Sequence, residues 1–215
     1  MFQNPRLRAA AVIAIALAAS ACAANPFTGP IEVTRFAAPQ TTNLGQGRIA
    51  LRFARELENE DAADAFRGAI SDELALRGYT IIANESIADQ IATVDTARNA
   101  QAAANEGGSP VSVGVGGGTG GFGTGLGVGV GFNLGSARDR SPRVVSELSV
   151  AIMENTGAPS RQNLWEARAQ FPTSVDSPYA PVAVNARALA AAIFKDFPQG
   201  NGETISLNAS ELVEP

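Results

Sequence analysis

Alternation of apolar and polar residues with a period of two recurs along most of this chain and restricts it to a fold built around a β-sheet. A half-buried strand has this period because successive side chains point to opposite faces of its sheet. The pattern is clearest in four segments: Ile31–Phe36, Arg48–Ala54, Val144–Met153 and Leu164–Phe171. Two further segments, Tyr79–Asn84 and Ala88–Ala97, are also predicted as strands. The turn-rich segment 155–163 joins the last two of the four clear segments as an antiparallel hairpin. Trp165 lies on the apolar side of the second strand and is predicted to face the core.

Two segments have helical periodicity instead. In the first, Asn59 is a suitable N-cap, acidic residues follow it, and Gly78 suits the position just after the helix. Its apolar stripe consists of Ala62, Phe66, Ile70 and Leu74. The second is Val182–Phe197, with a stripe of Val182, Ala186, Leu189, Ile193 and Phe197. We therefore predict an α+β fold, with an antiparallel sheet of about four to six strands and two helices packed on one face.

A glycine-rich insert, residues 107–135, interrupts this pattern, and 14 of its 29 residues are glycine. Glycine alternates with apolar residues such as Phe122, Leu126, Val130 and Phe132. One interpretation is a flexible low-complexity insert, because glycine loses the most conformational entropy on ordering. The other is a glycine-faced hairpin that lies flat on a membrane, a partner or its own domain. A G-x-G-x-x-G match inside the insert is expected by chance, and no helix follows it.

The first 22 residues indicate export. Arg6 and Arg8 precede an uncharged run of 13 residues, Ala9–Ala21, which is too short to span a bilayer and suits a secretory signal. Cys22, the only cysteine, follows small residues directly, and the pattern resembles a bacterial lipoprotein signal. The resemblance implies that Cys22 is the lipidation site, carrying acyl chains such as palmitate. The predicted organisation is a signal peptide (1–21), a tether (22–30), a single domain (31–198) and a C-terminal tail (199–215).

Charge and location limit the partners. Removal of residues 1–21 changes the net charge from −5 to −7, and an acidic domain gives no electrostatic footprint for nucleic acid. The predicted partners are the membrane, through the lipid on Cys22, and an envelope protein. Ala23 and Ala24 follow the cysteine, and no aspartate does. By resemblance to the enteric sorting rule, this favours the periplasmic face of the outer membrane.

The sequence contains no histidine, which removes the commonest general base and metal ligand. Carboxylates occur together at Glu60, Asp61 and Asp64 and at Asp89 and Asp95, but a charged helix N-terminus and a polar strand face explain them better. Glu166 and Arg168 fit a solvated face, and Lys195 fits the end of a helix. We predict no catalytic, cofactor-binding or metal-binding residue, and no enzyme activity.

Four short motifs follow one another in a fixed order: Leu74–Tyr79, Ala88–Asp89, Trp165–Ala169 and Phe197–Pro198. Over residues 48–198 this order resembles the DUF4136 family of bacterial lipoproteins. The chain departs from the family in its hairpin turn, where Glu154, Asn155 and Thr156 replace the usual aspartate-threonine pair. The resemblance implies an α+β domain and no activity, because the function of the family is unknown.

Two non-catalytic functions remain. In the first, the protein is a membrane-anchored binding or assembly module of the cell envelope. In the second, it is a structural or stress-related lipoprotein whose glycine-rich insert contacts the membrane or cell wall. The acidic mature chain favours protein contacts over anionic polymers.

Overall fold

The computed structural model describes residues 26–39, 41, 43–101, 143–156 and 163–215. The predicted signal peptide, Cys22 and the insert 107–135 lie outside these residues. The described part of the predicted tether lies along strand β6, because the amide of Gly29 donates to the carbonyl of Pro172 at 2.9 Å. The amide of Phe27 also donates to the Ser174 hydroxyl at 2.9 Å. The chain is thus fixed to the sheet from about residue 27 onwards.

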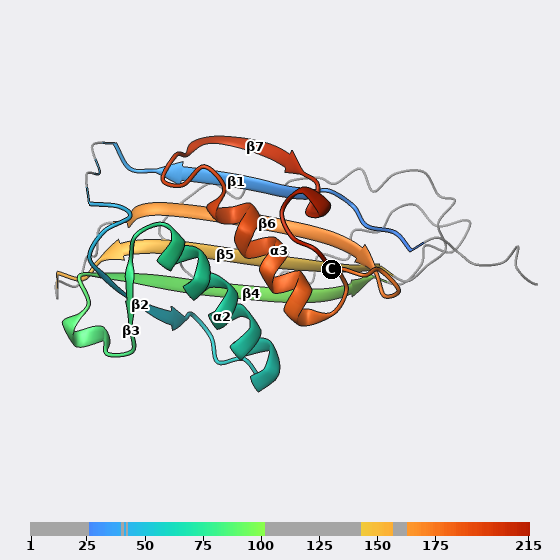
Figure 1. The fold of residues 1–215 in the computed structure, drawn as a ribbon, viewed down its shortest axis with the longest axis horizontal. Coiled ribbons are helices and arrows are strands. Elements are labelled where there is room, and N and C mark those ends of the chain that lie inside the picture. Colours follow the sequence, from blue (N-terminus) through green and yellow to red (C-terminus); the bar gives the residue numbers. More distant parts are fainter. Residues whose placement is uncertain (1–25, 40, 42, 102–142, 157–162) are drawn as a thin grey trace, which may run out of the picture.

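Seven strands form one sheet in the order β3-β2-β4-β5-β6-β1-β7 (Figure 1). The strands are β1 (Ile31–Ala37), β2 (Arg48–Phe53), β3 (Thr80–Ile82), β4 (Gln90–Gln101), β5 (Arg143–Glu154), β6 (Asn163–Ser174) and β7 (Asn201–Leu207). The α+β class is confirmed, as is the β5–β6 hairpin. The prediction of an antiparallel sheet with four to six strands is wrong, since the sheet is mixed and has seven strands.

The parallel part of the sheet arises from one helical crossover. Strand β2 is followed by α2 (Glu60–Leu76), which returns the chain so that β3 pairs with β2 in parallel. A short 3₁₀ turn, η2 (Glu85–Ile87), then leads to β4, which pairs in parallel with the other side of β2. The seventh strand comes from the predicted C-terminal tail, whose residues 201–207 pair with β1 as an antiparallel edge strand.

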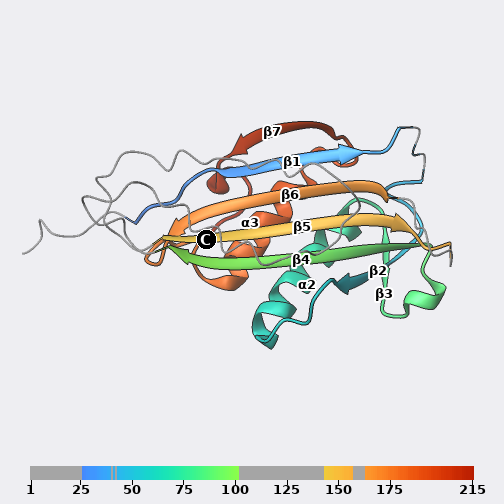
Figure 2. The ribbon, with the colours of Figure 1, turned by 180° about the vertical axis from the view of Figure 1, so that it is seen from behind.

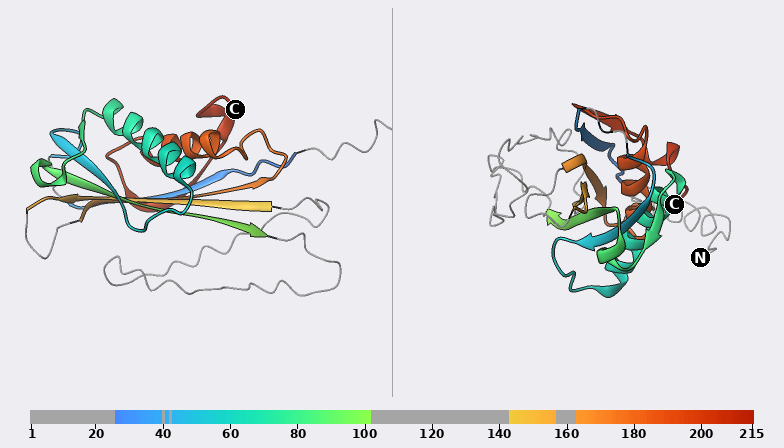
Figure 3. Two further views of the ribbon diagram at one scale, coloured as in Figure 1. Left: turned by 90° about the horizontal axis from the view of Figure 1, so that it is seen from below. Right: turned by 90° about the vertical axis from the view of Figure 1, so that its left-hand side faces the viewer.

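Both helices cover the same face of the sheet, as predicted (Figure 3). They are α2 and α3 (Val182–Phe194), and they run side by side. The Asn59 side chain accepts from the amide of Ala62 at 2.9 Å, so the predicted N-cap is confirmed. Gly78, at φ +100°, ends α2 in the left-handed region that glycine favours. Helix α3 ends at Phe194, three residues earlier than predicted.

The core lies between this face and the helices. Trp165 is 1% exposed and stacks on Phe194 with ring centroids 5.4 Å apart. Phe197 packs edge-on against the same indole at 5.0 Å. The view from behind shows β4, β5 and β6 in front of the helices (Figure 2). The sequence-based prediction that Trp165 faces the core is confirmed.

Candidate functional site

A cavity of about 340 Å³ lies where the N-terminal ends of both helices approach the middle of the sheet. Its walls come from the loop between β2 and α2, from the first turns of α2 and α3, and from β4 and β5. Both helices begin at the same end of the molecule (Figure 1), and residues of their first turns line the cavity. The volume falls at the small end of the range of about 300–1,000 Å³ that is usual for small-molecule sites.

The part of the wall formed by the sheet consists of Thr96, Ala97 and Arg98 on β4 and of Ser146, the cross-strand partner of Arg98, on β5. Ser146 is 1% exposed, and its hydroxyl has no hydrogen-bond partner among the described residues. An unsatisfied buried hydroxyl costs about 1–3 kcal/mol, so such groups are uncommon in folded proteins. Three other buried side-chain atoms, in Thr93, Gln170 and Thr173, are likewise unpartnered among the described residues.

Arg98 supplies a cation to the same wall. One of its guanidinium nitrogens, Nη2, donates to the carbonyl of Ala180 at 2.6 Å. Within the described part of the chain, no carboxylate forms an ion pair with Arg98, and partial burial lowers the pKa of its guanidinium. The side chain is exposed, and its other N–H groups have no partner among the described residues.

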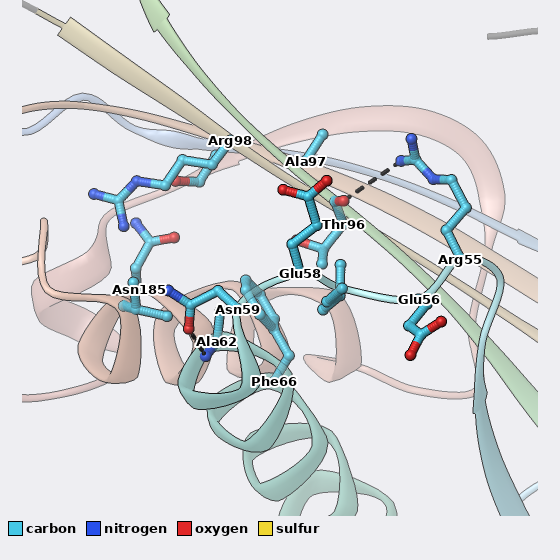
Figure 4. A pocket seen from close by; sticks show the side chains of 13 residues that line it. Arg55, Glu56, Glu58, Asn59, Ala62, Phe66, Thr96, Ala97, Arg98 and Asn185 are labelled. Carbon is cyan, nitrogen blue, oxygen red and sulfur yellow. Dashed lines mark hydrogen bonds between the residues drawn. The ribbon is translucent and has the colours of Figure 1, made fainter.

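The helix ends add partial positive charge. The first N–H groups of an α-helix have no intrahelical partner, and the macrodipole places about +0.5 of an elementary charge there. In α2 one of these groups is satisfied by Asn59, whereas Pro181 before α3 offers no side-chain cap. Asn185 of α3 is 1% exposed, and its Nδ2 donates to the carbonyl of Tyr179 at 3.2 Å. In Figure 4, the amide oxygen of Asn185 points toward the centre of the lining side chains.

Three charged residues of the β2–α2 loop also line the cavity. Arg55 pairs with Asp95 at 2.7 Å, whereas Glu56 and Glu58 are exposed. In Figure 4, the Glu58 carboxylate lies between Arg98 and Arg55, and Glu56 points away from Arg98. Apolar wall area comes from Leu57, Phe66 and Val182, together with two alanines. The site thus combines an apolar interior with a few polar groups of defined position.

The structure pairs Asp89 and Asp95 with two different arginines. Asp89 forms an ion pair with Arg48 at 2.9 Å. Its carboxylate accepts two hydrogen bonds from the Arg48 side chain and a third from the Arg48 amide, and these bonds lower the pKa of Asp89 to about 2. Asp95 pairs with Arg55 instead of with Asp89.

The other charged residues also have structural positions. Glu166 and Arg168 form a surface ion pair at 2.8 Å. Glu60 and Asp61 lie in the first turn of α2, with Asp64 exposed on the same helix, and Lys195 is the C-cap of α3. The structure thus gives Glu166 an arginine partner and keeps Glu60, Asp61 and Asp64 as the charged start of α2. Cys22 lies outside the described residues, so its lipidation stays a prediction.

The sequence analysis did not single out Arg98, Ser146 or Asn185, although two of them carry a signal. Ser146 occupies the position between Val144 and Leu148 on the apolar face of its strand. Asn185 lies next to Ala186 on the buried side of α3. A polar residue in the apolar repeat of a strand or helix is the pattern that would have found them.

No family model matches this chain, and no curated protein matches it. Two solved structures are similar in outline. A PDZ domain protein from Parabacteroides distasonis has a TM-score of 0.48 at 15% identity over 90% of this chain, which spans 42% of that protein. The PelC dodecamer from Paraburkholderia phytofirmans has a TM-score of 0.42 at 11% identity, covering 76% of this chain and 94% of that one. Neither likeness carries a conclusion about this chain. Neither described helix is long and apolar enough to cross a membrane.

Proposed function

We propose that this protein is a bacterial cell-envelope lipoprotein whose folded domain is a non-catalytic binding module. The anchor is Cys22, which ends a short apolar signal and has no other cysteine in the chain to pair with. Several acyl chains on one residue give stable anchoring, because each buried methylene contributes about 0.8 kcal/mol. The alanines after Cys22 favour the outer membrane.

One observation supports binding as the role of the domain: a cavity of about 340 Å³ combines the apolar side chains of Leu57, Phe66 and Val182 with a few polar groups from both helices and the sheet. Small-molecule sites in proteins are typically concave and mostly apolar, with a small number of placed polar groups. The carboxylates that sequence analysis considered for catalysis are held in ion pairs or lie at a helix start, which supports a non-catalytic role.

The anchor is tested by metabolic labelling with an alkyne fatty acid. The unchanged protein is expected to take up the label and to fractionate with membranes. Cys22→Ala is expected to lose the label and to move to the soluble fraction. A Cys22→Ala protein that still fractionates with membranes would contradict the lipoprotein assignment.

The binding role is tested by capture of a ligand from its own environment. The chain from residue 22 onwards, carrying Cys22→Ser so that no lipid is attached, is incubated with a small-molecule extract of bacterial envelopes and separated from free solute. Mass spectrometry then identifies what the denatured protein releases. The matched control is Ala62→Trp, which fills the cavity from the first turn of α2. Equal release from both proteins, or no release from either, would refute a binding role for this cavity.

A further inference from the structure

The N-terminal segment joins the fold at one end of the sheet. This end is formed by Gln101 of β4, Arg143 of β5 and Ser174 of β6, which are paired across the three strands, and we call it the anchor end (right-hand side of Figure 1). We propose that the anchor end contacts the headgroup layer of the bilayer that holds the acyl chains of Cys22. The inference rests on the proposed lipidation of Cys22.

Hydrogen bonds fix the N-terminal segment to the anchor end. The Ser174 hydroxyl accepts from the amide of Phe27 at 2.9 Å, and the Ser174 amide donates to the carbonyl of Phe27 at 2.8 Å. The hydroxyls of Thr28 and Ser177 lie 2.6 Å apart, and both serines are almost completely buried. Phe27 therefore belongs to the folded domain, and its position relative to the sheet is fixed.

The chain between Cys22 and Phe27 limits how far the anchor end can lie from the lipid. The five residue steps between them span at most about 18 Å when fully extended. Strand β5 has 12 residues, which correspond to a sheet about 40 Å long. The anchor end thus stays within about 18 Å of the attachment point, whereas the opposite end can be held well away from the bilayer surface.

The side chains at the anchor end suit a headgroup layer. The guanidinium carbon of Arg143 lies 4.4 Å from the ring centroid of Phe27, and Val175, directly after Ser174, is 52% exposed. Arginine covers apolar surface with its aliphatic stem, and its planar guanidinium can donate two hydrogen bonds to a phosphate. Phenylalanine and aliphatic side chains also meet the boundary between headgroups and acyl chains in interfacial helices. Exposed Asp176 opposes anionic lipid, so the phosphate of a zwitterionic phospholipid is the partner that fits.

The other large apolar side chains that are exposed among the described residues lie at the opposite end of the sheet. These are Phe36, near the end of β1, Leu76, the last residue of α2, and Ile87, in the turn before β4. A bilayer that met the domain through exposed apolar surface alone would contact this opposite end. The short chain from Cys22 favours the anchor end instead, so the two alternatives are separated by which end meets the lipid.

The test places one tryptophan at each end of the sheet. Val175→Trp and Ile87→Trp are each made together with Trp165→Phe, which removes the only native tryptophan, and circular dichroism verifies that both proteins are folded. The two sites are matched, because Val175 is 52% exposed and Ile87 is 51% exposed. The chain from residue 22 onwards is coupled through the thiol of Cys22 to a maleimide lipid in phosphatidylcholine vesicles. A phospholipid with a nitroxide on its headgroup quenches tryptophan at short range.

Coupling to the vesicles should affect the two proteins differently. In Val175→Trp the emission should shift to shorter wavelength and be quenched by the nitroxide lipid. In Ile87→Trp both wavelength and intensity should equal those of the uncoupled protein. A flexible linker of 20 glycine and serine residues, inserted after Ala24, adds about 25 Å of root-mean-square reach and should weaken the quenching in Val175→Trp. The same linker added after Pro215 is the control and should change nothing.

A second pair of variants tests the contact itself in the Val175→Trp protein. Arg143→Gln removes the guanidinium over Phe27 and should reduce the wavelength shift on coupling. The matched control is Arg67→Gln, since Arg67 is an exposed arginine of α2 that lies over the ring of Phe53 at 5.1 Å, away from the anchor end. If Arg143→Gln and Arg67→Gln leave the same shift, the assigned contact is wrong.

The outcomes separate this inference from the proposed function. Equal quenching at both sites would show that the domain lies flat on the bilayer, and quenching at neither site would show that no end contacts it; either result overturns the proposal, as does quenching in Ile87→Trp alone. Because the coupling is chemical, the orientation is measured independently of acylation in cells. The alkyne label on Cys22 decides the lipidation assignment separately.

Discussion

Truncation of the only tryptophan, Trp165→Ala, is the perturbation whose outcome depends most directly on the fold. Trp165 belongs to strand β6, and its side chain is almost completely buried between this strand and the C-terminal end of α3. Its ring stacks on Phe194 and meets Phe197 edge-on, and its indole Nε1 donates to the carbonyl of Gln199 at 3.4 Å. One side chain therefore joins the sheet to α3 and to the segment that follows it.

The expected loss follows from these contacts. Truncating a buried aromatic residue to alanine costs about 3–5 kcal/mol, and each aromatic pair adds about 0.5–1.5 kcal/mol beyond area burial. We expect a loss of about 4 kcal/mol in the free energy of unfolding. For a domain of this size, that corresponds to a midpoint about 8–16 °C lower. Trp165→Phe retains an aromatic contact and should lose less.

Urea unfolding followed by far-UV circular dichroism measures the effect, because the variant has no tryptophan fluorescence. The control is Val175→Ala, at a side chain that is 52% exposed and should lose less than about 0.5 kcal/mol. A cycle with Phe194→Ala isolates the stacked pair, with an expected coupling of about 0.5–1.5 kcal/mol. A loss below about 1 kcal/mol, or native emission like that of free tryptophan, would show that the β6 register is wrong by one residue, since such a slip turns every side chain over.

Three further predictions concern titration and chain connection. Burial raises the pKa of Tyr79 to about 12, above the value of about 10 in unfolded chains. The contribution of the neutral phenol to the free energy of unfolding should therefore be fully present below pH 10 and be lost as the pH rises toward 12. Tyr79→Phe should remove this pH dependence in urea titrations. Hydrogen bonds from Arg48 lower the pKa of Asp89 to about 2. The contribution of this carboxylate to stability should be present above about pH 4 and be lost as the pH falls through 2. In Asp89→Asn, the urea midpoint should change less with pH over this acid range. Replacing residues 102–142, which include the glycine-rich insert, by a four-residue turn should leave the melting temperature equal or higher. Strands β4 and β5 pair up to the point of insertion, and the shorter loop lowers the entropic cost of closure by about 2 kcal/mol; a fall of several degrees would show that residues 102–142 contribute to the core.

The sequence predicted the elements around the cavity but not the cavity itself. The Asn59 cap and the apolar stripe of α2 are local patterns, and the structure confirms both. Arg98 lies near the end of a long strand and has no periodic signature that separates it from a solvated arginine. Its proximity to Ser146 depends on the register of β4 against β5, and the segment between these strands gives no sequence rule for that register.

The sequence by itself determined six of the seven described strands and both helices, and for Trp165 and the stripe of α2 it determined the side that faces the core. These are local properties, because the period of the apolar residues, the cap and the glycine at a helix end act within a few residues. Trp165 was placed in the core on this basis alone, and the structure confirms it.

Only the tertiary structure decided the strand order, the parallel pairing of β2 with β3 and β4, and the addition of β7 at the edge beside β1. Alternation shows which face of a strand is buried and says nothing about its neighbour in the sheet. That choice depends on how α2 carries the chain from one strand to the next and on contacts between residues far apart in sequence. The cavity follows from the same choice, because Arg98, Ser146 and the two helix ends meet only once the strands have been ordered.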